Sequence, residues 1–389
     1  MKYTLRRMLT LVPAILLLSG CGKQPTPPVL SEAYEPPAPS YCAHLTLVGD
    51  LLYEQPYYDA LDAGDDPAAL FAQVMPYFER DDLTVGNMEV VISDGTLPVS
   101  GGEEYSFCAP RSIGEQVVAA GFDVLSTANN HANDRGKAGR DATVDFLAAN
   151  GVLPVGSFPD EAARSRLAVK EVNGIRFGFL AYTTFTNENV ESELRWSLGL
   201  CTEPESGAVD EALLVRELSE ARGQCDVLTV LMHWGTEFTF EPDSQQRELA
   251  RILCENGADL IVGSHSHCIQ PVETLTAADG HETLVFYSLG NFVSADDDVS
   301  RADETFDNAY QFGLLAELTV RMEDGRPVME DIATLPVVNY YDSALRGFAL
   351  VPLDRYDTAH EQSHYRYPLG LSADFIRSTY ETVIAPSYR

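Results

Sequence analysis

Positive charge is scarce in this sequence: 26 lysines and arginines stand against 59 aspartates and glutamates, and the formal net charge is −33. Such an acidic chain repels phosphate backbones, which argues against general nucleic-acid binding, although one locally positive site would still admit a nucleic acid as substrate. Attraction to an anionic membrane surface is disfavoured for the same reason. The chain has 389 residues, 45% of them hydrophobic, so we expect a large buried core rather than disorder.

The first hydrophobic run, Met8–Leu18, is too short to span a membrane, and three basic residues precede it. This shape predicts a signal peptide over residues 1–20. The run ends in Leu18-Ser19-Gly20-Cys21, which resembles the bacterial lipobox, and the resemblance implies that Cys21 is lipidated and becomes the mature N-terminus. We therefore expect an extracytoplasmic protein held at the cell membrane by a lipid anchor, with an ordinary secretory signal as the alternative.

A proline-rich segment follows, with six prolines between Gly22 and Ser40. Proline favours extended backbone, so residues 21–40 are predicted to be a tether between the membrane and the folded part. We expect one domain over residues 41–340 and a C-terminal extension over residues 341–389 that packs on it or flanks it. In the extension, only residues 372–383 predict a helix.

The chain contains no CxxC pair, so neither a zinc knuckle nor a thioredoxin-like redox site is supported. Besides Cys21 the cysteines are Cys42, Cys108, Cys201, Cys225, Cys254 and Cys268. An even number outside the cytoplasm permits disulfides, whereas buried cysteine also serves as a small hydrophobic residue. The sequence leaves both possibilities open.

Predicted strands and helices alternate along the folded part. Short apolar runs predict strands at residues 44–48, 82–85, 122–127, 152–155, 226–232, 258–262, 284–287, 312–320 and 332–337. Helices are predicted at residues 67–80, 112–120, 137–150, 210–222 and 244–256. Asn173-Gly174, between runs at 167–172 and 175–182, predicts a hairpin with a type I′ turn. This order predicts a layered α/β or αββα domain with functional loops at the carboxyl ends of the strands.

Polar side chains follow the ends of successive predicted strands. They are Asp50, Asn87, Glu89, Asn130, His131, His233, His265 and His267. Each alone is readily explained as a turn residue or a surface histidine, but carboxylates and imidazoles gathered at one sheet edge are ligands that Mn²⁺, Fe²⁺ or Zn²⁺ prefer. The sequence therefore predicts a divalent metal site. The remaining histidines lie away from strand ends and are expected at the surface: His44, His281, His360 and His364.

Six motifs between about His44 and Asn339 resemble, in order, those of the CapA capsule-synthesis family: LTLVGD, VGNMEV, FDVLSTANNHANDRG, VLMHWGTEF, GADLIVGSHSHCIQPVE and FYSLGNFV. Members of this family are linked to poly-γ-glutamate capsule assembly and have a metallophosphatase-like fold. The resemblance therefore implies a four-layer calcineurin-like domain that binds one or two metal ions. It further implies that Asn130 is a ligand and His131 the catalytic acid. The imidazole ligands that it implies are His233, His265 and His267.

The sequence departs from the metallophosphatase pattern at two positions. Metallophosphatases begin with Asp-x-His, whereas Asp50 is followed by Leu51 and Leu52, so one imidazole ligand is missing. Their second motif has a bridging aspartate where this chain has Asn87, with Glu89 two residues further on. Either Glu89 substitutes for that aspartate, or only one metal ion binds tightly.

Five further residues are predicted to bind the substrate or to shape its pocket. Arg135 and Arg140 lie at a predicted helix start, where the helix dipole favours anions, and are expected to contact a phosphate or carboxylate unless they merely face solvent. Trp234 would form a wall of the pocket and Glu237 would orient an imidazole, with a core aromatic and an exposed acid as the alternatives. Asn291 would shape the pocket rim through a tight turn.

Together these features predict a lipid-anchored protein of capsule or poly-γ-glutamate assembly or export that acts as a metal-dependent hydrolase on a phosphoester or an amide of an envelope polymer. The alternative is a non-catalytic component that binds or exports the polymer and keeps a retained or vestigial metal site. The expected partners are the membrane, an anionic polymer such as poly-γ-glutamate, and capsule-export proteins. Because the chain is acidic, a metal ion or a local basic patch would have to offset its repulsion of such a polymer.

Overall fold

The computed structural model describes residues 41–203, 205–295 and 304–389. The predicted leader, the tether and Cys21 therefore lie outside the described residues. Within the described ranges, no helix combines the length and the apolar character that crossing a membrane requires. The described residues belong to one compact unit.

Eight strands of the described residues form the first sheet, in the order β17-β16-β15-β1-β2-β6-β7, with β14 paired to β1. Strands β1, β2, β6 and β7 are parallel to one another, and β15, β16 and β17 pair antiparallel. The strands are β1 (Cys42–Leu51), β2 (Leu83–Met88), β6 (Val124–Ser126), β7 (Leu153–Val155), β14 (Asn291–Val293), β15 (Phe312–Glu323), β16 (Arg326–Tyr340) and β17 (Ala349–Pro352).

The second sheet has the order β12-β13-β11-β10-β9-β8. Its strands are β8 (Ala168–Val172), β9 (Ile175–Thr183), β10 (Val227–His233), β11 (Leu260–Ser264), β12 (Val272–Thr276) and β13 (Glu282–Phe286). The predicted hairpin is confirmed: β8 and β9 pair antiparallel, and Asn173 and Gly174 between them have φ angles of 51° and 82°. These positive φ angles are what a type I′ turn requires. A small third sheet contains β3 (Val91–Ile92), β4 (Ser100–Gly101) and β5 (Phe107–Ala109).

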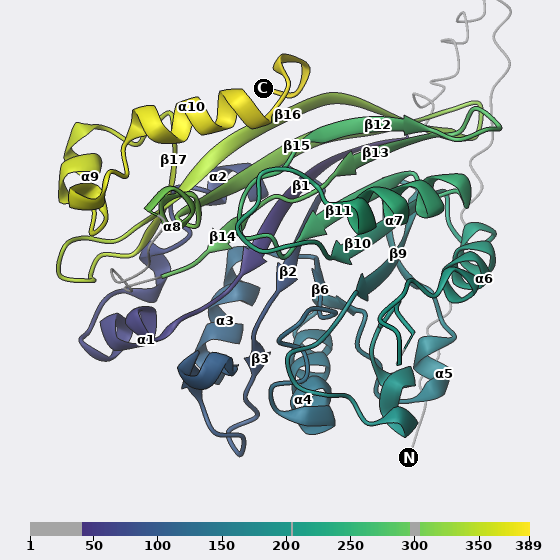
Figure 1. Ribbon diagram of the computed structural model, residues 1–389, viewed down its shortest axis with the longest axis horizontal. Coiled ribbons are helices and arrows are strands. Elements are labelled where there is room, and N and C mark those ends of the chain that lie inside the picture. Colours follow the sequence, from purple (N-terminus) through teal and green to yellow (C-terminus); the bar gives the residue numbers. More distant parts are fainter. Residues whose placement is uncertain (1–40, 204, 296–303) are drawn as a thin grey trace, which may run out of the picture. The chain divides into compact units, whose positions relative to one another are not determined.

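Three hydrophobic clusters separate four layers, because each strand presents alternate side chains to opposite faces of its sheet. Leu45 and Leu47 of β1 meet Phe177 of β9 in the cluster between the two sheets. The outer face of the first sheet packs on helices α1 to α4, and that of the second sheet packs on α6 and α7. Figure 1 shows α3 and α4 beside β2 and β6, and α6 and α7 beside β9 and β10. The predicted αββα architecture is therefore confirmed.

Several helices begin where the sequence offers a cap or a proline. Asp243 and Gln246 form a reciprocal capping box at the start of α7, and Ser372 caps α10. The helices are α1 (Gln55–Asp62), α2 (Met75–Phe78), α3 (Arg111–Ala120), α4 (Gly136–Ala149), α5 (Glu161–Arg164), α6 (Glu211–Arg222), α7 (Ser244–Glu255), α8 (Glu304–Ala309), α9 (Thr358–Ser363) and α10 (Ala373–Val383). Short 3₁₀ segments occur at Pro67–Ala69, Glu103–Tyr105, Ser192–Ser197, Tyr367–Leu369 and Pro386–Tyr388.

The prediction of one helix over residues 67–80 is wrong. The chain forms the 3₁₀ segment Pro67–Ala69 and the short helix α2, with turns between them. Pro76 stands in the first turn of α2. Because proline lacks an N–H and clashes with the preceding turn, it begins a helix rather than continuing one.

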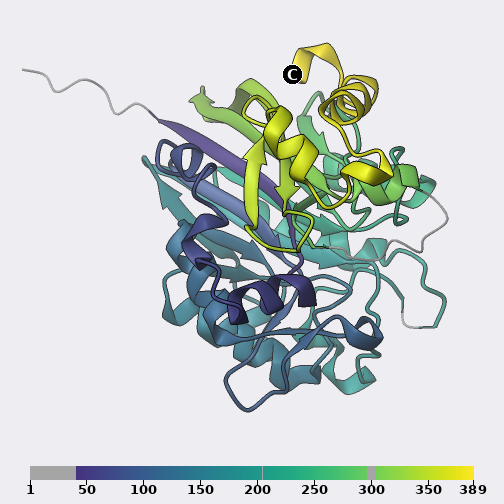
Figure 2. The ribbon, with the colours of Figure 1, turned by 90° about the vertical axis from the view of Figure 1, so that its left-hand side faces the viewer.

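The C-terminal residues belong to the same core as the sheets. Ile376 and Tyr380 of α10 join the cluster between the sheets, and the Tyr380 hydroxyl donates a hydrogen bond of 2.7 Å to the carbonyl of Thr334 in β16. Figures 1 and 2 show α10, in yellow, lying against β16 and away from the purple and blue helices α1 to α4. Residues 341–389 therefore cover a part of the long strand β16.

The structure also answers two questions that the sequence raised. The six cysteines of the described residues, Cys42, Cys108, Cys201, Cys225, Cys254 and Cys268, are unpaired, and all but Cys42 are buried. The expectation that His364 lies at the surface is wrong: it is 1% exposed, and its Nε2 lies 2.9 Å from the carbonyl oxygen of Asn339. This hydrogen bond satisfies the ring in the core, which periodicity could not reveal.

Candidate metal-binding site

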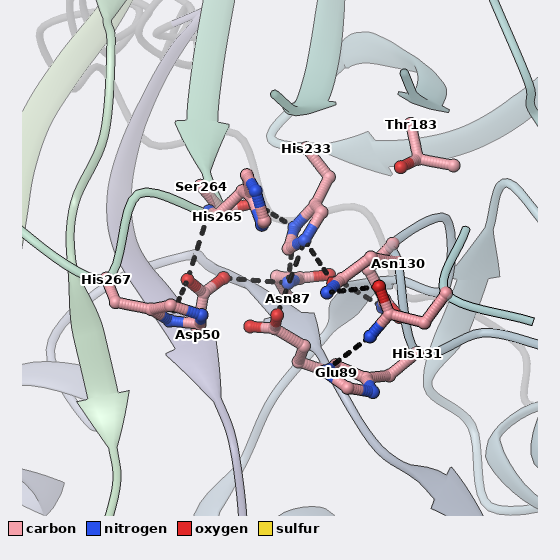
Figure 3. A network of polar contacts seen from close by, with 12 residues as sticks. Asp50, Asn87, Glu89, Asn130, His131, Thr183, His233, Ser264, His265 and His267 are labelled. Carbon is pink, nitrogen blue, oxygen red and sulfur yellow. Dashed lines mark hydrogen bonds and ion pairs between the residues drawn. The ribbon is translucent and has the colours of Figure 1, made fainter. Parts of the chain in front are cut away.

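The site lies where the carboxyl ends of strands from both sheets meet (Figure 3). Asp50 of β1 lies beside Asn87 of β2, and His233 of β10 lies beside Ser264 of β11. Neighbouring parallel strands end at the same edge, so each pair delivers polar side chains to one place. Asn87 links the two sheets, because its Nδ2 donates to Asp50 Oδ1 at 2.8 Å and lies 3.3 Å from His233 Nδ1.

Asp50 is fully buried and accepts a second hydrogen bond, of 3.1 Å, from the backbone N–H of His265 to Oδ2. The pKa of its carboxyl is raised to about 7, mainly by burial and then by the neighbouring carboxylate of Glu89. Burial in a low dielectric disfavours the charged form unless an opposite charge compensates. A cation beside Asp50 would supply that charge.

His233 is almost fully buried, and its ring nitrogens face three oxygen atoms. Its Nε2 lies 2.7 Å from Asn130 Oδ1 and 3.3 Å from Glu89 Oε1, while its Nδ1 lies 2.9 Å from Ser264 Oγ. Burial lowers the pKa of His233 to about 3, so the ring is neutral near pH 7. Neutral imidazole is the form that binds a metal ion.

His265 and His267 lie in the loop after β11, both with left-handed backbone at φ angles of 92° and 55°. This conformation costs a non-glycine residue about 1–3 kcal/mol and is concentrated at functional sites. It brings the two ring centroids to 5.8 Å from one another. Asn291, the first residue of β14, fixes the second ring, because its Oδ1 lies 2.9 Å from His267 Nδ1. Burial also lowers the pKa of His265 well below its ordinary value.

Buried polar atoms without partners mark the place where a cation fits. Both carboxylate oxygens of Glu89 are buried and accept no hydrogen bond from a described residue, and His265 Nδ1 is likewise unsatisfied. Burial raises the pKa of Glu89 to about 8, although the nearby His131 opposes this shift. An unsatisfied buried polar group costs about 1–3 kcal/mol. A divalent cation would satisfy these atoms, and the mixed oxygen and nitrogen donors suit Mn²⁺, Fe²⁺ or Zn²⁺.

The possible ligands of the described residues form three groups, and two of these share Glu89. The ligand atoms of Glu89, His233 and His265 lie within 4.8 Å of one another. The same is true of those of Asp50, Glu89 and His267. Glu89 thus lies where a residue bridging two ions would lie, whereas the uncharged Asn87 is engaged by Asp50. Substitution of the missing aspartate by Glu89 and binding of a single ion both stay predictions.

Sequence reasoning missed Asp134, which lies directly behind the predicted catalytic acid. Asp134 Oδ2 lies 2.9 Å from His131 Nδ1 and accepts a hydrogen bond of 2.6 Å from the backbone N–H of Phe107. A buried carboxylate at Nδ1 fixes the ring orientation and leaves Nε2 for proton exchange with a substrate. The sequence signal for this contact was the spacing, because Asp134 follows His131 by three residues. The turns before α4 bring the two side chains into contact.

A comparison with known families decides where this chain belongs. Residues 44–296, more than half of the chain, match the family model described as "Bacterial capsule synthesis protein PGA_cap". The chain belongs to this family. The matched range contains every ligand group described above.

Relatives of this family member are found in two Bacillus species. PGA biosynthesis protein CapA of Bacillus subtilis strain 168 is 27% identical over 297 residues, which cover 75% of this chain and 73% of that protein. Capsule biosynthesis protein CapA of Bacillus anthracis is 28% identical over 256 residues, which cover 64% of this chain and 59% of that protein. Among solved structures, the calcineurin-like phosphoesterase YfkN from Bacillus subtilis aligns with a TM-score of 0.38 at 13% identity, covering 89% of this chain and 99% of that chain.

In this family member, residues 184–190 form a loop over the site. The backbone N–H of Asn187 donates to the carbonyl of Asn130 at 2.9 Å, and Asn187 Nδ2 lies 3.5 Å from His131 Nε2. The ring of Phe185 lies edge-on to His265 with centroids 5.0 Å apart, and the residue is 37% exposed. The loop therefore gives the candidate metal-binding side chains a wall that faces solvent.

The prediction that Trp234 forms a wall of the pocket is wrong. Trp234 follows His233, and successive residues of an extended chain point to opposite sides. Its fully buried ring stacks on Tyr287 at a centroid distance of 6.0 Å, and Nε1 donates to the Tyr287 carbonyl at 2.8 Å. The residue belongs to the cluster under α6 and α7, so it supports the second sheet rather than the site.

The prediction that Arg140 binds an anionic substrate is also wrong. Arg140 is 3% exposed, and its guanidinium donates to Asn133 and, at 2.8 Å, to Ser197 Oγ. It is thus buried within the loops that it joins, where a substrate anion cannot reach it. Arg135 is partly exposed and donates to the carbonyl of Pro98 at 3.0 Å. Substrate binding by Arg135 stays a prediction.

Glu237, predicted to orient an imidazole, lies at the exposed side of the site. Its carboxylate lies within 4.8 Å of the ligand nitrogens of His265 and His267. This position makes it a possible donor to a metal ion.

Proposed function

We propose that this chain is an extracytoplasmic, lipid-anchored hydrolase that uses a divalent metal to cleave a phosphoester or an amide of an envelope polymer during capsule assembly. The printed names of its relatives, which refer to PGA and capsule biosynthesis, support the pathway and make poly-γ-glutamate the first polymer to test. The observation that carries the proposal is the buried Glu89 carboxylate, which lacks hydrogen bonds and is surrounded by imidazoles and Asp50.

The residues that would hold the metal come from four strand ends and one loop. They are Asp50, Glu89, Asn130, His233, His265 and His267. A bound Mn²⁺, Fe²⁺ or Zn²⁺ supplies Lewis-acid activation of the scissile group and of water. Asn87 and Asn291 keep Asp50 and His267 in place through hydrogen bonds of 2.8 Å and 2.9 Å.

His131 would donate the proton to the leaving group. Its Nδ1 is held by Asp134, and its Nε2 faces Asn187 on the solvent side of the site. The ring of Phe107 lies edge-on to it at a centroid distance of 4.6 Å, which restricts ring rotation. A general acid fixed in this way contributes about 10²- to 10⁴-fold to a rate.

The catalytic proposal is tested with the purified full-length protein reconstituted with each of the three metals. A phosphodiester, a phosphomonoester and a γ-glutamyl amide should be screened, and at least one should be hydrolysed by the wild type and not by His131→Ala carrying the same metal content. If the metal-loaded protein hydrolyses none of them but binds poly-γ-glutamate in a salt-dependent manner, the chain is a non-catalytic polymer-binding or export component and the hydrolase proposal fails.

The membrane location rests on the leader and on Cys21 alone. Substitution Cys21→Ser should abolish incorporation of labelled fatty acid and release the protein from the membrane fraction, because a short leader run cannot serve as a membrane span. Normal labelling of that variant, or a wild type without lipid, would contradict the lipid anchor and leave the catalytic proposal untouched.

A further inference from the structure

The two possible metal positions differ in the number of donors around them. The group Glu89, His233 and His265 has Asn130 Oδ1 close by, 2.7 Å from His233 Nε2. The group Asp50, Glu89 and His267 has no such additional donor from β1, because Leu52 occupies the position of the histidine in the Asp-x-His pattern. Leu52 is 3% exposed and packs in the hydrophobic cluster under α1 to α4. Metal ions of this class take four or more donors, so the second group is one donor short.

The loop after β10 brings a carboxylate to this side of the site. The loop is held against the loop of the two histidines, because the backbone N–H of Phe238 donates to the carbonyl of Ser266 at 2.8 Å. Gly235 and Phe238 have φ angles of 91° and 58°, which turn the chain between them. Glu237 therefore lies with its carboxylate within 4.8 Å of the ligand nitrogens of His265 and His267.

Two further observations point to a cation at this position. His265 Nδ1 is buried without a hydrogen-bond partner among the described residues, and the ligand atoms of His265, His267 and Glu237 lie within 4.8 Å of one another. No lysine or arginine of the described ranges pairs with the Glu237 carboxylate, although it adds negative charge beside Glu89. Carboxylates placed close together without a counter-ion repel one another, and a divalent cation would remove that repulsion.

We propose that Glu237 is a direct metal ligand that completes a second ion site with His267, Asp50 and the shared Glu89, and so replaces the imidazole missing at Leu52. The proposal rests on the proposed function, since it names the donor that turns that metal site into a two-ion site. Glu237 is the exposed member of the set, so the ion that it holds is the one nearest solvent. This ion exchanges first when a chelator is added.

The test is a titration of the metal-free full-length protein with Mn²⁺ alone, followed by calorimetry and by elemental analysis after desalting. The wild type should bind two ions per chain in two steps. Substitution Glu237→Gln should weaken the second step about tenfold or more and leave one ion after desalting, since even the residues that only support metal ligands are typically worth 10- to 100-fold in affinity. Glu241→Gln, which removes the same charge from an exposed residue of the same loop, is the matched control and should bind as the wild type does.

Each outcome has a distinct meaning. Two ions bound with unchanged affinity in Glu237→Gln, or a wild type that binds a single ion, would overturn the role of Glu237 while leaving the proposed metal site in place. A wild type that binds no Mn²⁺, Fe²⁺ or Zn²⁺ would refute the proposed function itself and the inference with it. Equal weakening by Glu241→Gln would show a general charge effect and would also overturn the assignment. Because Glu237 is exposed, its substitution should leave the unfolding temperature of the metal-free protein unchanged.

Discussion

Removing the buried charge of Glu89 should change how the stability of the metal-free protein depends on pH. The pKa of Glu89 is raised from its ordinary value of 4.5 to about 8 by burial, so the folded state favours the protonated carboxyl. The resulting stabilisation is fully present below pH 4.5 and is lost as the pH rises through about 8. Complete ionisation would cost at most about 5 kcal/mol, and about 2 kcal/mol of this falls between pH 6.5 and pH 8.

Between pH 6.5 and pH 8, two other buried groups also contribute to the change in the free energy of unfolding. The pKa of His233 is lowered from its ordinary value of 6.5 to about 3. The stability that His233 contributes is lost as the pH falls below 6.5, so above pH 6.5 this residue changes the free energy of unfolding by less than about 0.5 kcal/mol. The pKa of Asp50 is raised to about 7, so the stabilisation by its protonated form is also lost as the pH rises. Asp50 adds about 1 kcal/mol to the loss of free energy of unfolding over this interval. Glu89→Gln keeps the shape of the side chain and removes only the contribution of Glu89 to the pH dependence of the free energy of unfolding.

The assay is urea unfolding in a chelator at about pH 6.5 and about pH 8, followed by tryptophan fluorescence. The wild type should lose more free energy of unfolding over this interval than Glu89→Gln, by about 2 kcal/mol. Glu79→Gln, at an exposed position, should keep the slope of the wild type. Parallel pH profiles of wild type and Glu89→Gln would refute the reasoning, because Glu89 would then not be a buried, uncompensated acid. Adding Mn²⁺ to a hundredfold excess over Kd should restore about 2.7 kcal/mol to the wild type at the higher pH.

Three further outcomes follow from the contacts in the site. The double variant His265→Ala, His267→Ala should retain negligible metal after desalting, and a content equal to that of the wild type would contradict the ligand assignment. Asp134→Asn should lower kcat about 10²- to 10⁴-fold with unchanged metal content, and an unchanged kcat would show that His131 does not depend on this carboxylate. Arg140→Gln should lower the free energy of unfolding by about 1–3 kcal/mol, measured in urea, and leave the KM for an anionic substrate unchanged. A raised KM at unchanged stability would instead support contact of Arg140 with the substrate.

Local patterns in the sequence were sufficient for the layers of the fold. Alternating apolar runs and capped helices predicted the two sheets and their outer helices, and Asn173-Gly174 fixed the hairpin because a type I′ turn needs two positive φ angles. The one helix that failed contained Pro76, whose effect depends on where in the helix it falls. The ends of parallel strands also predicted which polar side chains meet at the candidate site, since such ends meet at one edge of a sheet.

What a side chain does at that edge was decided only by tertiary structure. Trp234 and His233 are neighbours in the sequence, yet one packs under α7 and the other faces the site. Arg140 is charged and close to the predicted acid in sequence, but the packing of loops around it buries its guanidinium. Such outcomes depend on contacts between distant segments, which no local pattern encodes.

The same holds for the replacements that the site requires. The sequence left open whether Glu89 substitutes for the bridging aspartate. It placed Leu52 where the metallophosphatase pattern has a histidine ligand. The backbone geometry of β1, β2 and the loop of His265 decides where these donors lie in space, and places Glu89 between two ligand groups. Sequence by itself therefore determined the family, the layers and the residue types of the site, because these follow from local periodicity and motif order. Which oxygen and nitrogen atoms face one another depended on the packing of the two sheets, because atoms far apart in the chain meet only there.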